Sequence, residues 1–149
     1  MSPAPAVEVV RETALPAEPL WAAMSDVTSW PAWLDTVTAV TPLEPGRPAE
    51  VGAAYRLTQP RLPEMVWRIT DWQPGRRFVW QSRRPGIVST GTHALEATGS
   101  GTRLRLTIAF TGPLAAPAGW FMGRVSRDHV EREAAAVVAR ARSLWDAAG

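Results

Sequence analysis

The last third of the chain changes its hydrophobic period once, and this change limits the possible folds more than any other feature. Between Arg103 and Thr111 apolar and polar residues alternate, as in a β-strand with one buried face. After Gly112 and Pro113 the apolar residues recur at spacings of three and four, as in an amphipathic helix. The strand face comprises Leu104, Leu106, Ile108 and Phe110, and the helical stripe comprises Val130, Ala134, Val137, Ala141 and Leu144. A sheet with one apolar face needs a second layer, and we expect the long helix to supply it.

Upstream of this point, turn residues divide the chain into short elements. The sequence predicts strands at 7–13, 37–42, 54–59, 65–72, 77–83, 87–97 and 103–111. It also predicts a helix at 17–24 and a second short helix from Asp26, which should end near Trp30 because Pro31 disfavours a helical residue before it. Short turns favour antiparallel neighbours. We therefore expect an α+β fold in one domain spanning residues 1–149, with a curved antiparallel sheet of about seven strands and a long C-terminal helix across it.

Composition narrows the cellular setting and the kinds of chemistry. The 149 residues suit one domain with a sizeable core, and cysteine is absent, so disulfide and thiol chemistry are excluded. The N-terminal residues lack the basic start and apolar run of a secretory signal. No apolar stretch approaches the ~18 residues of a membrane helix. We expect a cytoplasmic protein without membrane insertion.

The positive charge does not indicate nucleic acid as a partner. The net charge is only +2, and all 16 basic residues are arginine. With no lysine or cysteine and one tyrosine, almost nothing titrates between neutrality and the arginine pKa, so a small excess gives a very alkaline isoelectric point. The arginines are scattered singly or in pairs and form no basic stripe.

Several segments carry a resemblance to a known superfamily. They run from Leu15 to Val37, from Ile69 to Trp80 (ITDWQPGRRFVW), from Gly99 to Phe110 (GSGTRLRLTIAF) and from Gly112 to Val137, with Val51-Gly52 before the third strand. Together they resemble the START-like (SRPBCC) superfamily, and within it the bacterial polyketide cyclase/dehydrase and lipid transport group. The resemblance implies a helix-grip fold, with a cavity between the concave sheet face and the last helix. It implies no catalytic motif, because the group carries none in common.

Metal and cofactor motifs are absent from the sequence. It contains no phosphate-binding glycine loop, no G-x-S-x-G and no H-E-x-x-H. Two histidines without cysteine make a zinc site unexpected. His129 and Glu133 lie four residues apart on one helix face, a spacing that suits a metal or a surface ion pair, and we favour the ion pair. We expect no metal and no cofactor.

His93 is the candidate catalytic residue. On its strand it shares parity with Leu95, which should face the core, so His93 should point inward. A buried imidazole can act as a general base. The alternative is a core histidine satisfied by a neighbouring hydroxyl or carbonyl group.

Eight tryptophans are unusual in a chain of this length and favour an aromatic cavity or a large core. Tyr55 and Arg56 lie on opposite strand faces, so only one of them can line a cavity. Plain core packing is the alternative for every residue of the candidate set. The residues expected to contact a ligand are Trp33, Tyr55, Arg56, Trp67, Ile69, Trp80, His93, Phe121, Met122 and Val125.

Three functions remain open at this stage. The first is binding of a hydrophobic or amphipathic small molecule by a monomer or homodimer. The second is a polyketide cyclase or dehydratase, in which His93 is the base and Tyr55 or Arg56 stabilises an enolate oxygen. The third is a non-catalytic regulatory or stress module whose pocket is filled by side chains.

Overall fold

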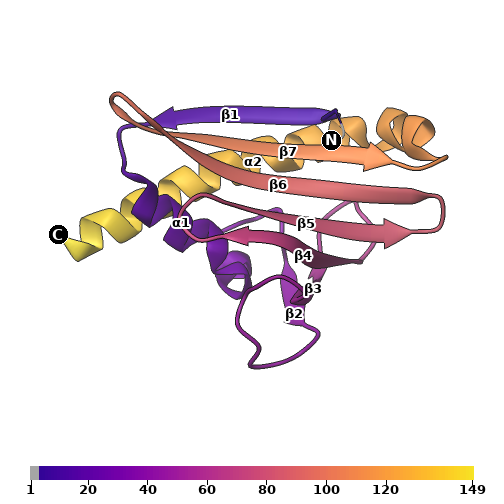
Figure 1. Cartoon of the computed structure of the whole chain (residues 1–149), viewed down its shortest axis with the longest axis horizontal. Coiled ribbons are helices and arrows are strands. Elements are labelled where there is room, and N and C mark those ends of the chain that lie inside the picture. Colours follow the sequence, from indigo (N-terminus) through magenta and orange to yellow (C-terminus); the bar gives the residue numbers. More distant parts are fainter. Residues whose placement is uncertain (1–3) are drawn as a thin grey trace.

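The computed structural model describes residues 4–149 and contains the elements in the predicted order (Figure 1). Strand β1 (Val7–Thr13) precedes helix α1 (Ala17–Ser25) and the 3₁₀ helix η1 (Val27–Ala32). Six strands and the last helix follow: β2 (Ala39–Pro42), β3 (Ala54–Thr58), β4 (Met65–Gln73), β5 (Arg77–Arg84), β6 (Ile87–Thr98), β7 (Gly101–Thr111) and α2 (Ala115–Ala148). The predicted α+β helix-grip fold is confirmed.

The seven strands form one antiparallel sheet in the order β1-β7-β6-β5-β4-β3-β2. Short turns join β4 to β5, β5 to β6 and β6 to β7, whereas longer loops at 43–53 and 59–64 join β2 to β3 and β3 to β4. Strand β1 pairs with β7, which is distant in sequence. The β5–β6 turn depends on Gly86, which has φ +82 and would place a Cβ atom 2.8 Å from the side chain of Leu114. Glycine therefore permits both the tight turn and the close approach of the chain that enters α2.

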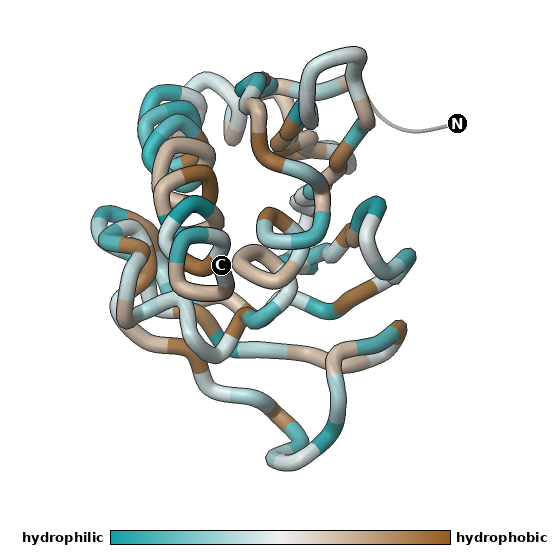
Figure 2. The backbone as a smooth tube through the Cα atoms, turned by 90° about the vertical axis from the view of Figure 1, so that its left-hand side faces the viewer, coloured by the Kyte–Doolittle hydropathy of each residue, from teal (hydrophilic) through white to brown (hydrophobic). Residues whose placement is uncertain are grey.

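Helix α2 forms the second layer. It runs along one face of the sheet, and α1 lies toward the C-terminal end of the molecule (Figure 1). From that end, α2 is seen as a layer apart from the strands (Figure 2). The predicted stripe faces the sheet: Val130, Ala134, Val137 and Ala141 are buried. Buried Leu104 and Leu106 of β7 contribute to the same core, and burial of each such side chain stabilises the fold by about 1.5–3 kcal/mol.

The first half of the chain departs from the sequence prediction in two places. Pro31 lies inside η1, which continues to Ala32, whereas we expected the helix to end at Trp30. The 3₁₀ geometry tolerates Pro31 because the local backbone bonds come from other residues, such as the bond from the Trp33 amide to the Trp30 carbonyl (3.1 Å). Strand β2 begins at Ala39 rather than at Val37, whose side chain is buried in the preceding loop.

A β-bulge in β4 changes which residues face the core. The β4–β5 register shifts between Ile69 and Asp71, so Thr70 has no direct partner. As a result Trp72, not Asp71, points inward and packs edge-on against Trp21, with ring centroids 5.0 Å apart. Simple alternation along the sequence would place Asp71 on the same face as Ile69, and the extra residue of the bulge breaks that alternation. Asp71 instead pairs with Arg77 at 2.7 Å, near the end of the strand.

Candidate functional site

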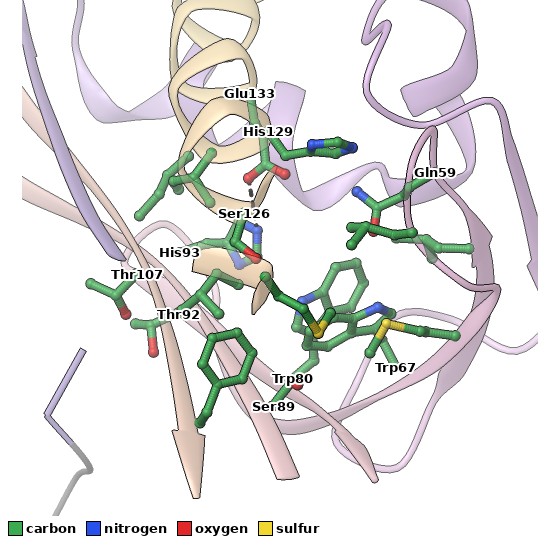
Figure 3. Close-up of a pocket in the computed structure, with 18 of the residues that line it drawn as sticks. Gln59, Trp67, Trp80, Ser89, Thr92, His93, Thr107, Ser126, His129 and Glu133 are labelled. Atoms are coloured by element: carbon green, nitrogen blue, oxygen red, sulfur yellow. Dashed lines mark ion pairs between the residues drawn. The ribbon is translucent and has the colours of Figure 1, made fainter. Parts of the chain in front are cut away.

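A cavity of about 70 Å³ lies between the inner face of the sheet and α2 (Figure 3). It exceeds the roughly 10–15 Å³ that one water molecule needs but is far below the roughly 300–1,000 Å³ of pockets for drug-sized ligands. Its lining is mostly apolar, and several polar residues line it from α2. The lining residues are Trp30, Leu57, Gln59, Leu62, Met65, Trp67, Trp80, Ser89, Thr92, His93, Leu106, Thr107, Ile108, Phe110, Met122, Ser126, His129, Val130 and Glu133.

Three indole rings form the aromatic wall of the cavity. Trp80 lies 5.5 Å from Trp67 and 5.4 Å from Trp30, measured between ring centroids. The partner of Trp80 on β6 is Gly91, where a Cβ atom would lie 2.9 Å from the indole nitrogen. Because Gly91 has no side chain, the indole of Trp80 can lie across the backbone of β6. The wall therefore depends on a small residue on one strand and a large one on its neighbour.

His93 points into this site, as strand parity predicts, and is only 4% exposed. Its ring stacks on Phe78 at a centroid distance of 4.2 Å and an angle of 10°. Its Nε2 lies 3.1 Å from Oε2 of Glu133, whose side chain is 14% exposed. A carboxylate accepts hydrogen bonds, so Nε2 carries the proton and donates a hydrogen bond to Glu133. In the neutral ring the lone pair is then on Nδ1.

His129 is the second histidine at the cavity, one turn before Glu133 on α2. Its Nδ1 lies 2.9 Å from the carbonyl oxygen of Val125, so Nδ1 carries the proton and the neutral ring has its lone pair on Nε2. The expected surface ion pair between His129 and Glu133 is not formed, because His129 is buried and Glu133 pairs with His93 instead. Within residues 4–149 no group of three or more His, Cys, Asp or Glu side chains is arranged to hold a metal ion.

Polar atoms without partners concentrate around the cavity. Within residues 4–149, five buried side-chain nitrogen or oxygen atoms have no hydrogen-bond partner in the protein. Four of them belong to residues that line the cavity: Nε1 of Trp30 and of Trp67, Nδ1 of His93, and Nε2 of His129. The indole nitrogens are donors and the neutral imidazole nitrogens are acceptors. Since nearly all buried polar groups in proteins are hydrogen-bonded, this concentration is unusual for a core that serves packing alone.

Four of the predicted contact residues meet at the cavity: Trp67, Trp80, His93 and Met122. Tyr55 and Ile69 are buried in the surrounding core and do not line it. Burial raises the pKa of the Tyr55 phenol, so this hydroxyl stays protonated at neutral pH.

The other four predicted residues lie away from the cavity wall. Arg56 is on the exposed face of β3, where it pairs with Glu64 at 3.2 Å. Trp33 donates a hydrogen bond from Nε1 to Ser29 at 3.0 Å and packs on the outside of the core. Phe121 is exposed, and Val125 contributes its backbone carbonyl to His129. Thus neither Arg56 nor Tyr55 is placed to stabilise an enolate in the cavity.

The polar residues that sequence reasoning missed come mainly from α2. Ser126, His129 and Glu133 follow the predicted Met122 at spacings of four, three and four, which places all four residues on one helix face. This second stripe runs beside the apolar one. A helix face that mixes polar and apolar residues, beside a face that is wholly apolar, is the sequence signal by which this cavity wall could have been predicted.

The sequence comparison identifies the family. Residues 4–144 match the family described as polyketide cyclase / dehydrase and lipid transport. The chain belongs to this family. The match spans nearly the whole chain and confirms the resemblance found in its segments. No curated protein sequence matches the chain.

Solved structures agree with this assignment at the level of fold. The Zhui aromatase/cyclase from Streptomyces sp. R1128 is 21% identical over 96% of each chain, with a TM-score of 0.76. The di-domain aromatase/cyclase StfQ from the steffimycin biosynthetic pathway is 15% identical, with a TM-score of 0.73 over 93% of this chain and 51% of its own. The protein TTHA0849 from Thermus thermophilus is 18% identical over 93% of this chain and 97% of its own, with a TM-score of 0.70. At such identities the likeness establishes the shared fold alone.

None of the helices in residues 4–149 combines the length and apolar character needed to cross a membrane.

Proposed function

We propose that the protein binds a compact apolar or amphipathic molecule in the cavity between the sheet and α2. The observation that carries this proposal is the set of four unpartnered polar atoms on the cavity-lining residues. A ligand with an apolar body and a few polar substituents can satisfy them after small rotations of the four side chains, because these atoms are buried beside the cavity rather than open to it. Its carbonyl or ether oxygens suit the indole N–H groups of Trp30 and Trp67, and its hydroxyl groups suit the imidazole nitrogens. The family to which the chain belongs supports a hydrophobic ligand.

The driving force comes from the aromatic wall. Each 100 Å² of apolar surface removed from water contributes about 2.5 kcal/mol. A micromolar affinity corresponds to about 8 kcal/mol, which a one- or two-ring ligand can supply if its surface is largely buried. The small volume selects against long chains unless the first turns of α2 move outward.

A titration tests this proposal. An environment-sensitive apolar dye should bind with an affinity of about 1 µM and quench the tryptophan fluorescence, because Trp30, Trp67 and Trp80 line the cavity. Native mass spectrometry of protein purified from its source should show a co-purifying ligand. If neither a dye nor any member of a lipid panel changes the fluorescence, the proposal is wrong and the non-catalytic module with a filled pocket is favoured.

A second candidate function is catalysis of the cyclase or dehydratase type, and the His93–Glu133 pair favours it. In the structure the carboxylate of Glu133 is an acid–base partner for His93. Glu133 holds the ring proton on Nε2 and stabilises the imidazolium that forms when Nδ1 takes a proton from a carbon acid. The stacking on Phe78 fixes the orientation of the ring. The cavity would hold the reacting carbon and carbonyl in contact.

Two substitutions separate the candidates. His93→Phe keeps a planar ring on Phe78 and removes both nitrogens, while Glu133→Gln keeps an acceptor oxygen and removes the charge. If the protein only binds, dye affinity should change by about tenfold at most, because one neutral hydrogen bond contributes roughly 1 kcal/mol. If it is a cyclase, turnover of a synthetic poly-β-keto thioester should fall by about a hundredfold or more in both variants. Absence of turnover by the wild-type protein on such substrates would count against the second candidate.

A further inference from the structure

An exposed apolar patch lies where the chain enters α2. Leu114 is 52% exposed, Trp120 78% and Phe121 73%. The rings of Trp120 and Phe121 contact each other edge to face at a centroid distance of 4.7 Å. Large aromatic side chains this exposed have a cost in water, and adjacent ones commonly mark an interaction site. We call Leu114, Trp120 and Phe121 the entry patch.

The entry patch adjoins an apolar surface groove that leads toward the ligand cavity. The groove has a volume of about 290 Å³ and is lined by Leu114 and Phe121 together with Arg84 and Ile87, which flank the β5–β6 turn. Met65, Ser89 and Met122 line both the groove and the cavity. The groove beside the patch is therefore separated from the candidate binding site only by these three side chains, and their movement would join the two. Flexible methionines at this point suit the passage of differently shaped molecules.

Cations without acidic partners surround the entry patch. Arg84 lines the groove, and Arg124 lies one helical turn after Trp120 and Phe121, followed by Arg127. Within residues 4–149, none of these three arginines has a carboxylate within 4.0 Å. The neighbouring chain segments 83–95 and 109–127 contain no Asp or Glu.

Two arginines of β7 on the far side of the sheet show the opposite arrangement. There Arg103 pairs with Glu12 at 2.6 Å, and Arg105 pairs with Glu8 at 2.9 Å. These two outer-face arginines of β7 are thus neutralised by carboxylates, whereas the three arginines around the patch are not. A free positive rim around exposed aromatic rings is complementary to an anionic surface with an apolar interior.

We propose that the entry patch docks the protein on the surface of an anionic lipid bilayer. Trp120 and Phe121 enter the headgroup region, as aromatic side chains do at membrane interfaces, and Arg84, Arg124 and Arg127 bind lipid phosphates. This contact is peripheral and involves no spanning helix. Docking places the groove against the lipid, so that an apolar ligand passes between bilayer and cavity without crossing water. The transfer step rests on the proposed ligand binding, whereas docking itself does not.

Vesicle co-sedimentation tests the docking. The wild-type protein should sediment with phosphatidylcholine vesicles that contain phosphatidylglycerol and only weakly with pure phosphatidylcholine. Each arginine near an anionic surface strengthens binding about fivefold, so Arg84→Glu/Arg124→Glu should weaken it by more than about 25-fold. Trp120→Ala/Phe121→Ala should lose binding to a similar extent. Higher salt should also weaken binding by the wild-type protein.

Matched controls come from the other end of the same helix. Trp145 is an exposed tryptophan near the C-terminal end of α2, roughly 37 Å from Trp120 at 1.5 Å per residue. Trp145→Ala and Arg140→Glu/Arg142→Glu should leave vesicle binding unchanged. The proposal is overturned if Trp145→Ala weakens vesicle binding as much as Trp120→Ala/Phe121→Ala does, or if the wild-type protein does not bind anionic vesicles.

Two further measurements distinguish membrane docking from a dimer interface and from the proposed ligand binding. If light scattering shows a dimer that Trp120→Ala/Phe121→Ala converts to a monomer, the patch is an interface between copies of the chain and the docking proposal is wrong. Dye binding by the Trp120→Ala/Phe121→Ala variant in solution, without vesicles, reports on the cavity alone. Loss of vesicle binding with retained dye binding in the patch variant supports docking. Vesicle binding by a wild-type protein that binds no dye leaves docking standing and contradicts the proposed ligand binding.

Discussion

At the scale of single residues, the site depends on which side chains the strands and the helix turn inward. Strand parity was enough to place His93 in the interior, because Leu95 on the same face marks the core side. Parity did not reveal its partner Glu133, because the rotation of α2 about its own axis is set by packing against the sheet. His129 was missed for the same reason. A predicted strand face is thus more informative than a predicted helix face when the helix carries two adjacent stripes.

Gly91 gives a prediction at this scale. Gly91→Ala places a Cβ atom 2.9 Å from the indole nitrogen of Trp80, and the rigid ring must shift. We expect a loss of about 1–3 kcal/mol in the free energy of unfolding and a weaker dye affinity. Gly99→Ala is the control, because a Cβ atom there has nothing within 4 Å. Urea denaturation of both variants checks the prediction, and equal stability of the two would contradict the described wall.

At the scale of elements, the strand ends followed from turn residues, and the errors arose where an extra or unusual residue was accommodated. The bulge in β4 leaves the sequence pattern looking regular, so its effect on Trp72 and Asp71 was not visible in advance. The loops that border the cavity were also beyond prediction, since they are held by ion pairs between distant segments. Arg61 of the β3–β4 loop pairs with Asp128 of α2, and Arg132 of α2 pairs with Asp35.

The Asp128 ion pairs should control the mobility of the β3–β4 loop. Burial by itself raises the pKa of Asp128, but hydrogen bonds from Arg61 and Arg132 outweigh it, and the pKa lies below its usual value. A carboxyl group with a lowered pKa stabilises the fold above its unfolded-state pKa of about 3.9, and this stabilisation is lost as the pH falls through the lower folded-state value. At neutral pH Asp128 is charged and its ion pair with Arg61 holds the β3–β4 loop against α2. Asp128→Asn removes this charge, so amide exchange of residues 59–64 should become faster.

Hydrogen exchange measured by mass spectrometry checks this prediction. The global unfolding midpoint should change little, because the pair is on the surface. Asp146→Asn, at an exposed position near the C-terminus, should have no effect on the loop. Equal amide exchange of the loop in Asp128→Asn and in the wild-type protein at pH 7 would contradict the claim that Asp128 limits the mobility of the β3–β4 loop.

At the scale of the whole molecule, the order of elements and the grip of the helix on the sheet were predictable from the single change of hydrophobic period. The apolar strand face and the apolar helix stripe must each be removed from water, and they are buried by packing against each other. The size of the cavity was not predictable, because it depends on how far Trp30, Trp67 and Trp80 fill the interior. Sequence patterns report which face is buried, and they do not report the space that remains.

The two-layer arrangement makes a direct prediction about truncation. Removal of 113–149 exposes the inner face of β7 and the rest of the sheet core, so cooperative thermal unfolding should be lost. Removal of 146–149 only, which are exposed, should leave the transition in place. Calorimetry of both truncated proteins checks this. A sharp transition of the shorter protein as a monomer would contradict the arrangement.

The most direct test of the central claim is a dye titration of a variant whose cavity is filled. Ser126 is buried and lines the cavity from α2, whereas Ser143 is exposed on the same helix. Both substitutions to leucine are made in the Trp120→Ala/Phe121→Ala background, which removes dye binding at the entry patch. If the ligand occupies the cavity, Ser126→Leu should weaken dye affinity by about tenfold or more with cooperative unfolding retained, and Ser143→Leu should not change it. Equal affinities of the two leucine variants would show that the ligand binds elsewhere.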